Sequence, residues 1–443
     1  MFLRMLLVAA VGALAGVAVW FLLQRRHRLG GLPARRLLAA VAAVGLGCRL
    51  AFAFGTPTFY APDEQAHFQY VRYLAEQRAL PVQTSRMNDP THDWEYYQPP
   101  LYYLVLAPVH LLADGLFHDR AITVRALRLV SILLWGVTLL FALRFLDELR
   151  VEGGLVRATV VGMVGLLPTY VFLSSSLNND NLLVALGGAI LWRAAKPASL
   201  RNSLWLGALA GLALLTKLTA VVFLVLFLTV PVVGLLRRSL AARAWPHALL
   251  ATSLAALSFA PWAWRNQVVY GSVTAEEIAN VPRRWDSMAE AVLGTLRYMQ
   301  DSFWAVSGVY NNVAFFYPMI GRHLAYLALV GLLIGVVLRR DRLRRALPVD
   351  RDLVASLALA LAVNALLVFR FGLLYGQGQG RFLYALLVPG ALLVGAGLRM
   401  FTLADREDAP LHLTGFFATY ALSFTAYSLA MFPRGDAPWG PAG

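Results

Sequence analysis

Two adjacent carboxylic acids, Asp63 and Glu64, are the best-marked candidates for chemistry in this sequence of 443 residues. They follow an apolar run and open a long polar stretch, in the segment PDEQAH at 62–67. A partly desolvated carboxylate can act as a general base or bind a cation, and Glu64 would then support Asp63 or exchange roles with it. His67, four residues from Asp63, would share one helix face with it and orient it, or simply form hydrogen bonds at the interface. The structural alternative is a helix N-terminus, where Pro followed by Asp-Glu is common.

A further acidic residue, Asp180, lies in the polar junction 178–181 between two apolar runs. It can serve as a second catalytic carboxylate. The junction can equally form a turn that caps the following helix, because Asn and Asp are favoured at such positions. Both interpretations stay open.

Basic side chains near apolar segments are candidates for binding an anion such as phosphate. Lys217, one of only two lysines, is surrounded by apolar residues, where an ionisable group is costly and marks a functional site by default. Its alternative role is to extend from a helix end to water. Arg381 follows glycines at 376, 378 and 380, which allow close approach of a ligand, and arginine binds phosphate bidentately. Its alternative is an interfacial arginine on a flexible loop, and Arg265 is a weaker third candidate.

The segment YYQPPLYY at 96–103 ends the polar stretch that the acidic pair begins. Two prolines close an irregular segment, and tyrosines then enter the membrane interface. The pattern alone is a common interfacial one. On the same loop as the acidic pair, it makes Gln98 and Tyr102 candidates for contact with a substrate.

These residues are set in a chain with the composition of a membrane protein. Hydrophobic residues make up 59% and charged residues 14%, against roughly 45–50% and about 25% in soluble domains. The net charge of +15 lies in short basic clusters between apolar runs, which follows the positive-inside rule and argues against nucleic acid as a partner. The single cysteine, Cys48, excludes an intrachain disulfide.

The whole chain, 1–443, is predicted to be one all-α transmembrane domain of about 12 or 13 helices, because crossing a bilayer takes about 20 apolar residues. The candidate runs are 2–23, 38–55, 101–117, 123–146, 155–176, 180–195, 203–216, 218–236, 248–266, 323–338, 352–369, 381–401 and 411–432. The first is interpreted as a retained span and not a signal peptide. The run 101–117 is short and contains proline, so it is predicted to be re-entrant or interfacial.

Basic loops orient this bundle. Loops 24–37, 193–202, 237–247 and 339–351 are predicted to be cytoplasmic, beside anionic lipid. The long loops 56–100 and 267–322 then lie outside. Within the second, 286–306 has the helical spacing of an amphipathic helix lying in the interface.

In its order of motifs the chain resembles the GT-C superfamily of membrane glycosyltransferases, which includes protein O-mannosyltransferases and lipid A aminoarabinose transferases, and most of all a group of bacterial predicted membrane proteins related to them. The resemblance covers about 50–400, and the extra N-terminal span departs from it. The motifs are the acidic pair with the segment at 96–103, followed by SSSLNND at 174–180, LLTKLT at 214–219, PWAWRN at 261–266 and GQGRF at 378–382.

The resemblance implies a cell-envelope enzyme of the bacterial inner (plasma) membrane with its site on the extracytoplasmic face. Such an enzyme takes a sugar from a polyprenyl-phosphate carrier and passes it to a lipid, glycan or protein acceptor, usually with inversion. On this basis Asp63 becomes the leading candidate base, and Asp63, Lys217 and Arg381 are expected to line one cavity.

Two alternatives remain at this stage. A transporter or flippase for a lipid-linked saccharide would also place charges in a membrane cavity, but no repeated halves are evident. No cofactor is required, although Asp63, His67, His92 and Asp93 on one loop leave a divalent metal open, without a compact ligand motif. No glycine-rich nucleotide-binding pattern is present, which disfavours a sugar-nucleotide donor.

Overall fold

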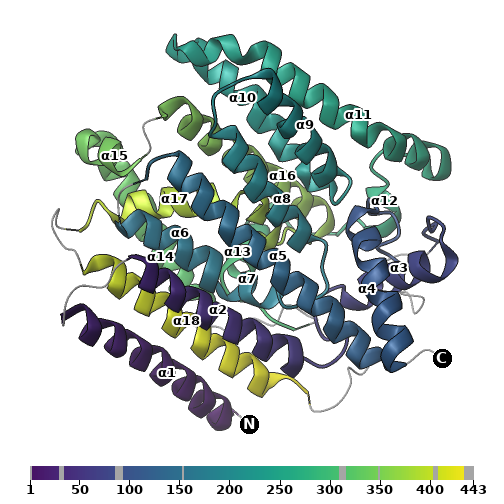
Figure 1. Cartoon of the computed structure of the whole chain (residues 1–443), viewed down its shortest axis with the longest axis horizontal. Helices are drawn as coiled ribbons and strands as arrows, with labels where there is room; N and C mark the ends of the chain where they lie inside the picture. Colours follow the sequence, from purple (N-terminus) through teal and green to yellow (C-terminus); the bar gives the residue numbers. More distant parts are fainter. Residues whose placement is uncertain are drawn as a thin grey trace.

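The computed structural model describes residues 2–28, 34–84, 93–151, 154–308, 316–347, 350–402 and 408–433, and every regular element in these ranges is a helix (Figure 1). The longest helices are α1 (Phe2–Arg28), α2 (Ala34–Gly55), α5 (Arg120–Glu148), α10 (Val221–Arg237), α11 (Trp245–Tyr270), α14 (Phe316–Val337), α16 (Arg351–Tyr375) and α18 (Ala409–Met431). The others are α3 (Glu64–Gln77), α4 (Leu101–Phe117), α6 (Gly154–Leu166), α7 (Pro168–Leu173), α8 (Asp180–Ala194), α9 (Leu200–Leu214), α12 (Glu276–Ala279), α13 (Met288–Trp304), α15 (Arg340–Ala346) and α17 (Leu387–Leu398). Three short 3-10 segments are η1 (Leu218–Ala220), η2 (Leu240–Ala244) and η3 (Gly380–Leu386).

The chain is an all-α polytopic membrane protein. Within the described residues, seven helical segments are long and apolar enough to cross a membrane. They are Val8–Arg25, Arg36–Gly55, Arg120–Glu148, Leu218–Arg237, Phe316–Val337, Arg351–Tyr375 and Gly380–Leu398. Leu101–Phe117 and Gly154–Leu166 are apolar but shorter. The count of about 12 or 13 crossings and the re-entrant or interfacial placement of 101–117 therefore stay predictions.

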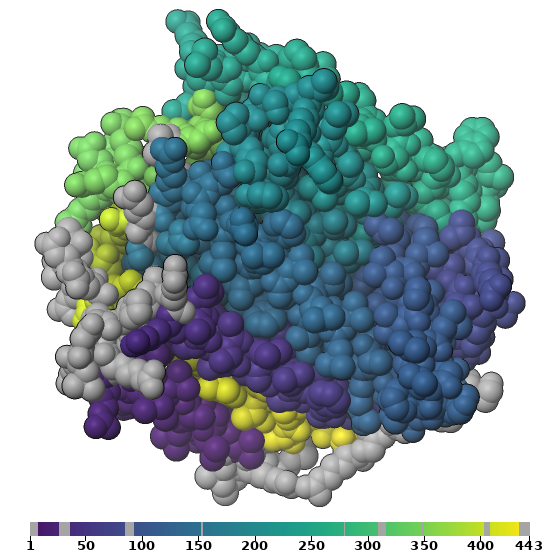
Figure 2. Space-filling view, viewed as in Figure 1, coloured from purple at the N-terminus to yellow at the C-terminus, as the bar shows by residue number. Residues whose placement is uncertain are grey.

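The N-terminal helix packs along the C-terminal one at an edge of the molecule. In Figure 1, α1 lies beside α18, and in the space-filling view their purple and yellow surfaces adjoin at the lower edge, opposite the teal helices (Figure 2). Two glycines of α1 allow this approach. A Cβ on Gly16 would come within 2.3 Å of Thr419 Cα, and one on Gly12 within 2.6 Å of the Leu422 carbonyl oxygen. Small residues at such spacing let membrane helices approach closely.

Two predicted spans are broken, and the breaks place polar residues inside the bundle. The run 155–176 divides into α6 and α7 at Pro168, because proline has no amide hydrogen to continue the helical ladder. The run 381–401 begins as the 3-10 turn η3 before α17. The predicted amphipathic helix at 286–306 is present as α13, which packs on α14 and η3.

The long helices separate two chemically different ends of the bundle. At one end, α8 begins at Asp180, and η1, which leads into α10, begins directly after Lys217. The helix α16 ends at the same place, before the loop that leads to Arg381. At the opposite end, residues of the three predicted cytoplasmic loops after 192 meet around a second cavity of about 750 Å³, at 194–203, 240–248 and 350–353. This arrangement puts the three basic loops on one side, as the positive-inside rule predicts.

Candidate active site

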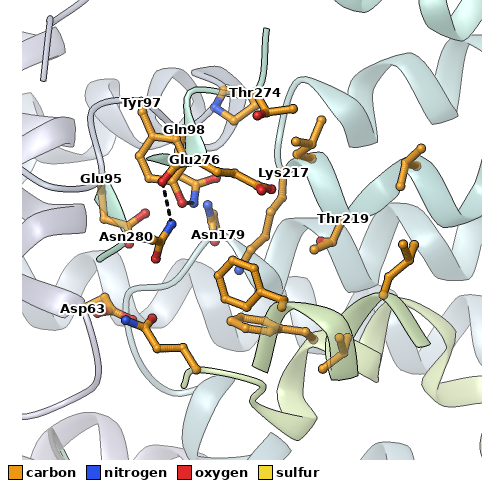
Figure 3. Close-up of a pocket in the computed structure, with 18 of the residues that line it drawn as sticks. Asp63, Glu95, Tyr97, Gln98, Asn179, Lys217, Thr219, Thr274, Glu276 and Asn280 are labelled. Atoms are coloured by element: carbon orange, nitrogen blue, oxygen red, sulfur yellow. Dashed lines mark hydrogen bonds between the residues drawn. The ribbon is translucent and has the colours of Figure 1, made fainter. Parts of the chain in front are cut away.

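A cavity of about 230 Å³ opens where the segments on either side of α3, the polar junction before α8 and the loop before η3 meet (Figure 3). One part of its lining is polar and contains most of the sequence-predicted residues, namely Asp63, His67, Gln98, Lys217 and Arg381. The other part is apolar and comes mainly from α10, α11 and α16, with Val221, Phe259, Trp262, Leu367, Val368 and Phe371. The expected meeting of Asp63, Lys217 and Arg381 in one cavity is confirmed.

Two acids and two bases form a connected ionic group at this site. The Arg381 guanidinium donates to Asp63 Oδ2 at 2.8 Å, and the Lys217 ammonium donates to Asp180 Oδ1 at 2.6 Å. Arg381 Nε lies 3.9 Å from Asp180 Oδ2 and joins the two pairs. We name Asp63, Asp180, Lys217 and Arg381 the ionic group. Its members come from four separate segments of the chain and balance formally to zero charge.

The backbone at Asp63 directs its carboxylate into this group. Asp63 directly precedes the first residue of α3, so the acidic pair does stand at a helix N-terminus. The Asp63 side chain, however, makes no capping hydrogen bond. Its φ of 58° is left-handed, a conformation that non-glycine residues adopt rarely and that occurs at functional sites. Burial opposes ionisation, but the surrounding basic side chains, above all the Arg381 guanidinium, together outweigh it and lower the pKa of Asp63 below its usual value.

Glu64, by contrast, is enclosed in a buried ion pair with Arg128 of α5. Arg128 Nε donates to Glu64 Oε1 at 2.9 Å, and Nη2 donates to Oε2 at 2.6 Å. The amides of Phe59 and Leu177 also donate to this carboxylate. Both side chains are almost completely buried, and Glu64 is not in the cavity lining. Of the two carboxylates between which the sequence could not choose, the geometry favours Asp63 for contact with a substrate.

His67 lies in the first turns of α3 and faces α4. Its Nδ1 is 2.9 Å from the Tyr103 hydroxyl and 3.9 Å from Glu95 Oε2. Burial, opposed by the charge of Asp63, lowers the pKa of His67 to about 3, so the ring is neutral at physiological pH. His67 is therefore positioned as a neutral hydrogen-bonding residue in the cavity wall.

Three other predicted residues have different positions. Gln98 lines the cavity, and its side-chain amide donates to the Tyr97 hydroxyl at 2.9 Å. Tyr102 is buried outside the lining, where its hydroxyl accepts from the Asn178 amide at 3.0 Å. Arg265 also lies outside the lining: it donates to the Pro81 carbonyl, and its guanidinium lies 4.6 Å from the ring centroid of Trp262. Of these three residues, Gln98 therefore lines the cavity, and Tyr102 and Arg265 do not.

Sequence reasoning missed Glu95, which lines the cavity from the turn before α4. Burial and the nearby charge of Asp63 raise the pKa of Glu95 to about 8. Glu95 lies among aromatic residues, directly before the segment YYQPPLYY. An acid in that position was the feature of the sequence from which its place in the site could have been predicted. Arg128 was missed too, because an arginine near the start of an apolar run is ordinary.

Unused hydrogen-bonding capacity points to an anion. Arg381 Nη1 and Nε are buried donors that have no hydrogen-bond partner among the described residues. Buried polar atoms are usually paired, so such atoms mark a place where a ligand or water belongs. For a metal the case is different: no group of three metal-ligating side chains occurs in the described ranges. His92 lies outside those ranges, so the divalent metal stays an open prediction.

Comparison with solved structures identifies the fold. The chain matches the crystal structure of ArnT from Cupriavidus metallidurans bound to undecaprenyl phosphate, with a TM-score of 0.53 and 14% identity, over 90% of this chain and 77% of that one. This protein has the GT-C fold. The apo structure of the same ArnT also matches, with a TM-score of 0.39 and 16% identity over 86% of this chain and 76% of that one. No protein-family model and no curated protein gives a significant match.

Proposed function

We propose that this GT-C protein is a membrane glycosyltransferase that transfers a sugar from a polyprenyl-phosphate carrier to an acceptor on the extracytoplasmic side of a bacterial plasma membrane. The observation that carries the proposal is the ionic group, which puts a carboxylate and two cations in one cavity with an apolar wall. A lipid phosphate requires these two kinds of surface together. The structural neighbour ArnT was crystallised with undecaprenyl phosphate, which agrees with a ligand of this class.

The cations would hold the carrier phosphate. Arg381 Nη1 has no hydrogen-bond partner among the described residues and is available to a phosphate oxygen. The Lys217 ammonium lies 4.9 Å from the ring centroid of Phe382, the residue that follows Arg381. Charge-assisted hydrogen bonds from these donors would stabilise the negative charge that develops on the leaving phosphate. The isoprenoid chain would then follow the apolar lining of α10, α11 and α16.

Asp63 would be the base. The acceptor hydroxyl oxygen forms a bond to the anomeric carbon, the bond from that carbon to the phosphate oxygen breaks, and the hydroxyl proton passes to Asp63. A single displacement of this kind inverts the anomeric centre and requires one base. In the resting site Arg381 holds the pKa of Asp63 low. A phosphate that draws Arg381 away would raise the basicity of Asp63, so donor binding would prepare the base.

The separation of the two ends supports the proposed membrane orientation. If loops 193–202, 237–247 and 339–351 face the cytoplasm, the helices between them and the ionic group place the cavity at the outer side. Polyprenyl-linked sugars are then the available donors, because sugar nucleotides are cytoplasmic. The identity of the sugar and of the acceptor is left to experiment.

The test uses the purified protein in liposomes with radiolabelled polyprenyl-phosphate sugars and bacterial envelope extract as the source of acceptors. We expect the wild type to transfer label, and Asp63→Asn to transfer it at least about a hundredfold more slowly, as is typical when a general base is lost. Glu76→Gln, on the exposed surface of α3, is the matched control. Equal transfer by Asp63→Asn would remove Asp63 from the base role. Movement of lipid across the bilayer without transfer would favour the flippase.

A further inference from the structure

Glu95 is a buried acid that the proposed displacement does not use. The residue is 8% exposed, and its Oε2 is buried without a hydrogen-bond partner among the described residues. Its Oε2 lies 3.9 Å from Nδ1 of His67, whose ring is neutral at physiological pH. A buried carboxyl oxygen without a hydrogen-bond partner is destabilising. Its retention in the cavity wall therefore indicates a role toward a bound molecule.

The surroundings of Glu95 differ from those of the ionic group. Tyr97, Gln98 and Asn280 also line the cavity and are neutral groups that both donate and accept hydrogen bonds, and the acid Glu276 lines it beside them. Figure 3 shows Glu95, Tyr97, Gln98 and Asn280 grouped on one side of the cavity, with Lys217 on the other. Burial, together with the nearby charge of Asp63, raises the pKa of Glu95 to about 8, so at neutral pH Glu95 carries a proton and is itself a neutral group that donates and accepts.

This division matches the two halves of a glycosyl phosphate. The phosphate needs cations, while sugar hydroxyl groups need neutral donors and acceptors at several angles. We propose that Glu95, together with Gln98 and Asn280, binds hydroxyl groups of the transferred sugar and so decides which sugar the protein accepts. The inference rests on the proposed function and adds the residues that recognise the sugar to those that hold the carrier.

A protonated carboxyl group is well suited to this task. It donates one hydrogen bond through its hydroxyl and accepts another through its carbonyl oxygen, so it can contact two neighbouring hydroxyl groups. A site built around such contacts rejects an analogue that lacks the hydroxyl, because the protein group is then left buried and unpaired. The sugar lacking the contacted hydroxyl is thus expected to bind more weakly than its parent.

The experiment compares lipids with and without a sugar. Binding of undecaprenyl phosphate and of undecaprenyl phosphate bearing glucose, galactose or mannose is measured by calorimetry in detergent. We expect the wild type to bind at least one glycosylated lipid about tenfold or more tightly than the bare phosphate. Glu95→Ala should lose this advantage and keep its affinity for the bare phosphate within about twofold. Glu95→Gln, whose side chain is neutral and still forms hydrogen bonds, should retain most of the higher affinity for the glycosylated lipid. Glu76→Ala is the surface control.

The outcomes separate the two proposals. If the wild type binds no polyprenyl phosphate at all, the proposed function fails. If it binds the bare phosphate but shows no preference for a sugar, or if Glu95→Ala weakens both kinds of lipid equally, the assignment of Glu95 to the sugar is overturned and the carrier site stands. Circular dichroism and gel filtration of each variant confirm that it is folded before binding is compared.

Discussion

The ion pair between Glu64 and Arg128 gives the sharpest test of how this site is held together. Arg128 donates five hydrogen bonds, two to Glu64 and three to the carbonyl oxygens of Ala53, Thr56 and Pro57. These contacts join α5 to the end of α2 and to the turn before α3. We therefore expect Arg128→Met to loosen the segment that presents Asp63.

The magnitude follows from what the substitution leaves behind. Removing one partner of a buried ion pair costs about 3–5 kcal/mol, because the other charge stays buried without compensation. Here Glu64 would keep two amide donors, from Phe59 and Leu177, which partly stabilise its charge. We therefore expect the lower part of that range, about 3 kcal/mol of unfolding free energy. Arg144→Met, an exposed arginine on the same helix, should change it by less than about 0.5 kcal/mol.

A double-mutant cycle measures the coupling directly. Unfolding is followed by circular dichroism during titration with sodium dodecyl sulfate for the wild type, Arg128→Met, Glu64→Gln and the double variant. The double variant leaves no unpaired charge, so its loss should be smaller than the sum of the two single losses by about 1 kcal/mol or more. Strictly additive losses, or an Arg128→Met protein as stable as the control, would refute the view that this pair supports the acidic loop.

Three further predictions concern charge, pH and packing. Arg381→Lys should lower the affinity for undecaprenyl phosphate about tenfold or more, because lysine does not reproduce the guanidinium fork, and calorimetry measures this loss. Affinity for the same lipid should fall as pH rises through about 8, since Glu95 then ionises and repels the phosphate; Glu95→Gln should remove this dependence. Gly16→Ala should destabilise the protein in thermal unfolding because its Cβ meets Thr419, whereas Gly47→Ala, with open space around the added carbon, should be neutral or slightly stabilising.

The sequence alone determined the membrane character and most of the charged residues of the site. An apolar surrounding makes a charge costly, so a carboxylate or ammonium that persists there is visible without a structure. Lys217 was recognisable for this reason, Asp63 from the acidic pair after an apolar run, and Arg381 from the glycines before it. The helix α13 was recognisable from its helical spacing of apolar residues. These signals are local, because each depends on the residues next to it in the chain.

Only the tertiary structure decided which charges meet. Asp63 and Arg381 are 318 residues apart, and Glu64 reaches Arg128 across 64 residues. No local pattern distinguishes an arginine that snorkels from one that is buried against a carboxylate, since both lie near a helix end. The tertiary fold brings Arg128 of α5 to Glu64 as its structural partner and leaves Asp63 facing the cavity.

The burial of Glu95 was beyond the sequence for the same reason. The turn that contains Glu95 carries aromatic residues and resembles an ordinary interfacial segment. His67, Tyr97 and Asn280, from other parts of the fold or the same turn, line the cavity with it. The cost of a buried carboxyl group arises only when distant segments exclude water from it. Composition thus determined that the chain would enter a membrane, and long-range packing decided which of its polar groups would face a ligand.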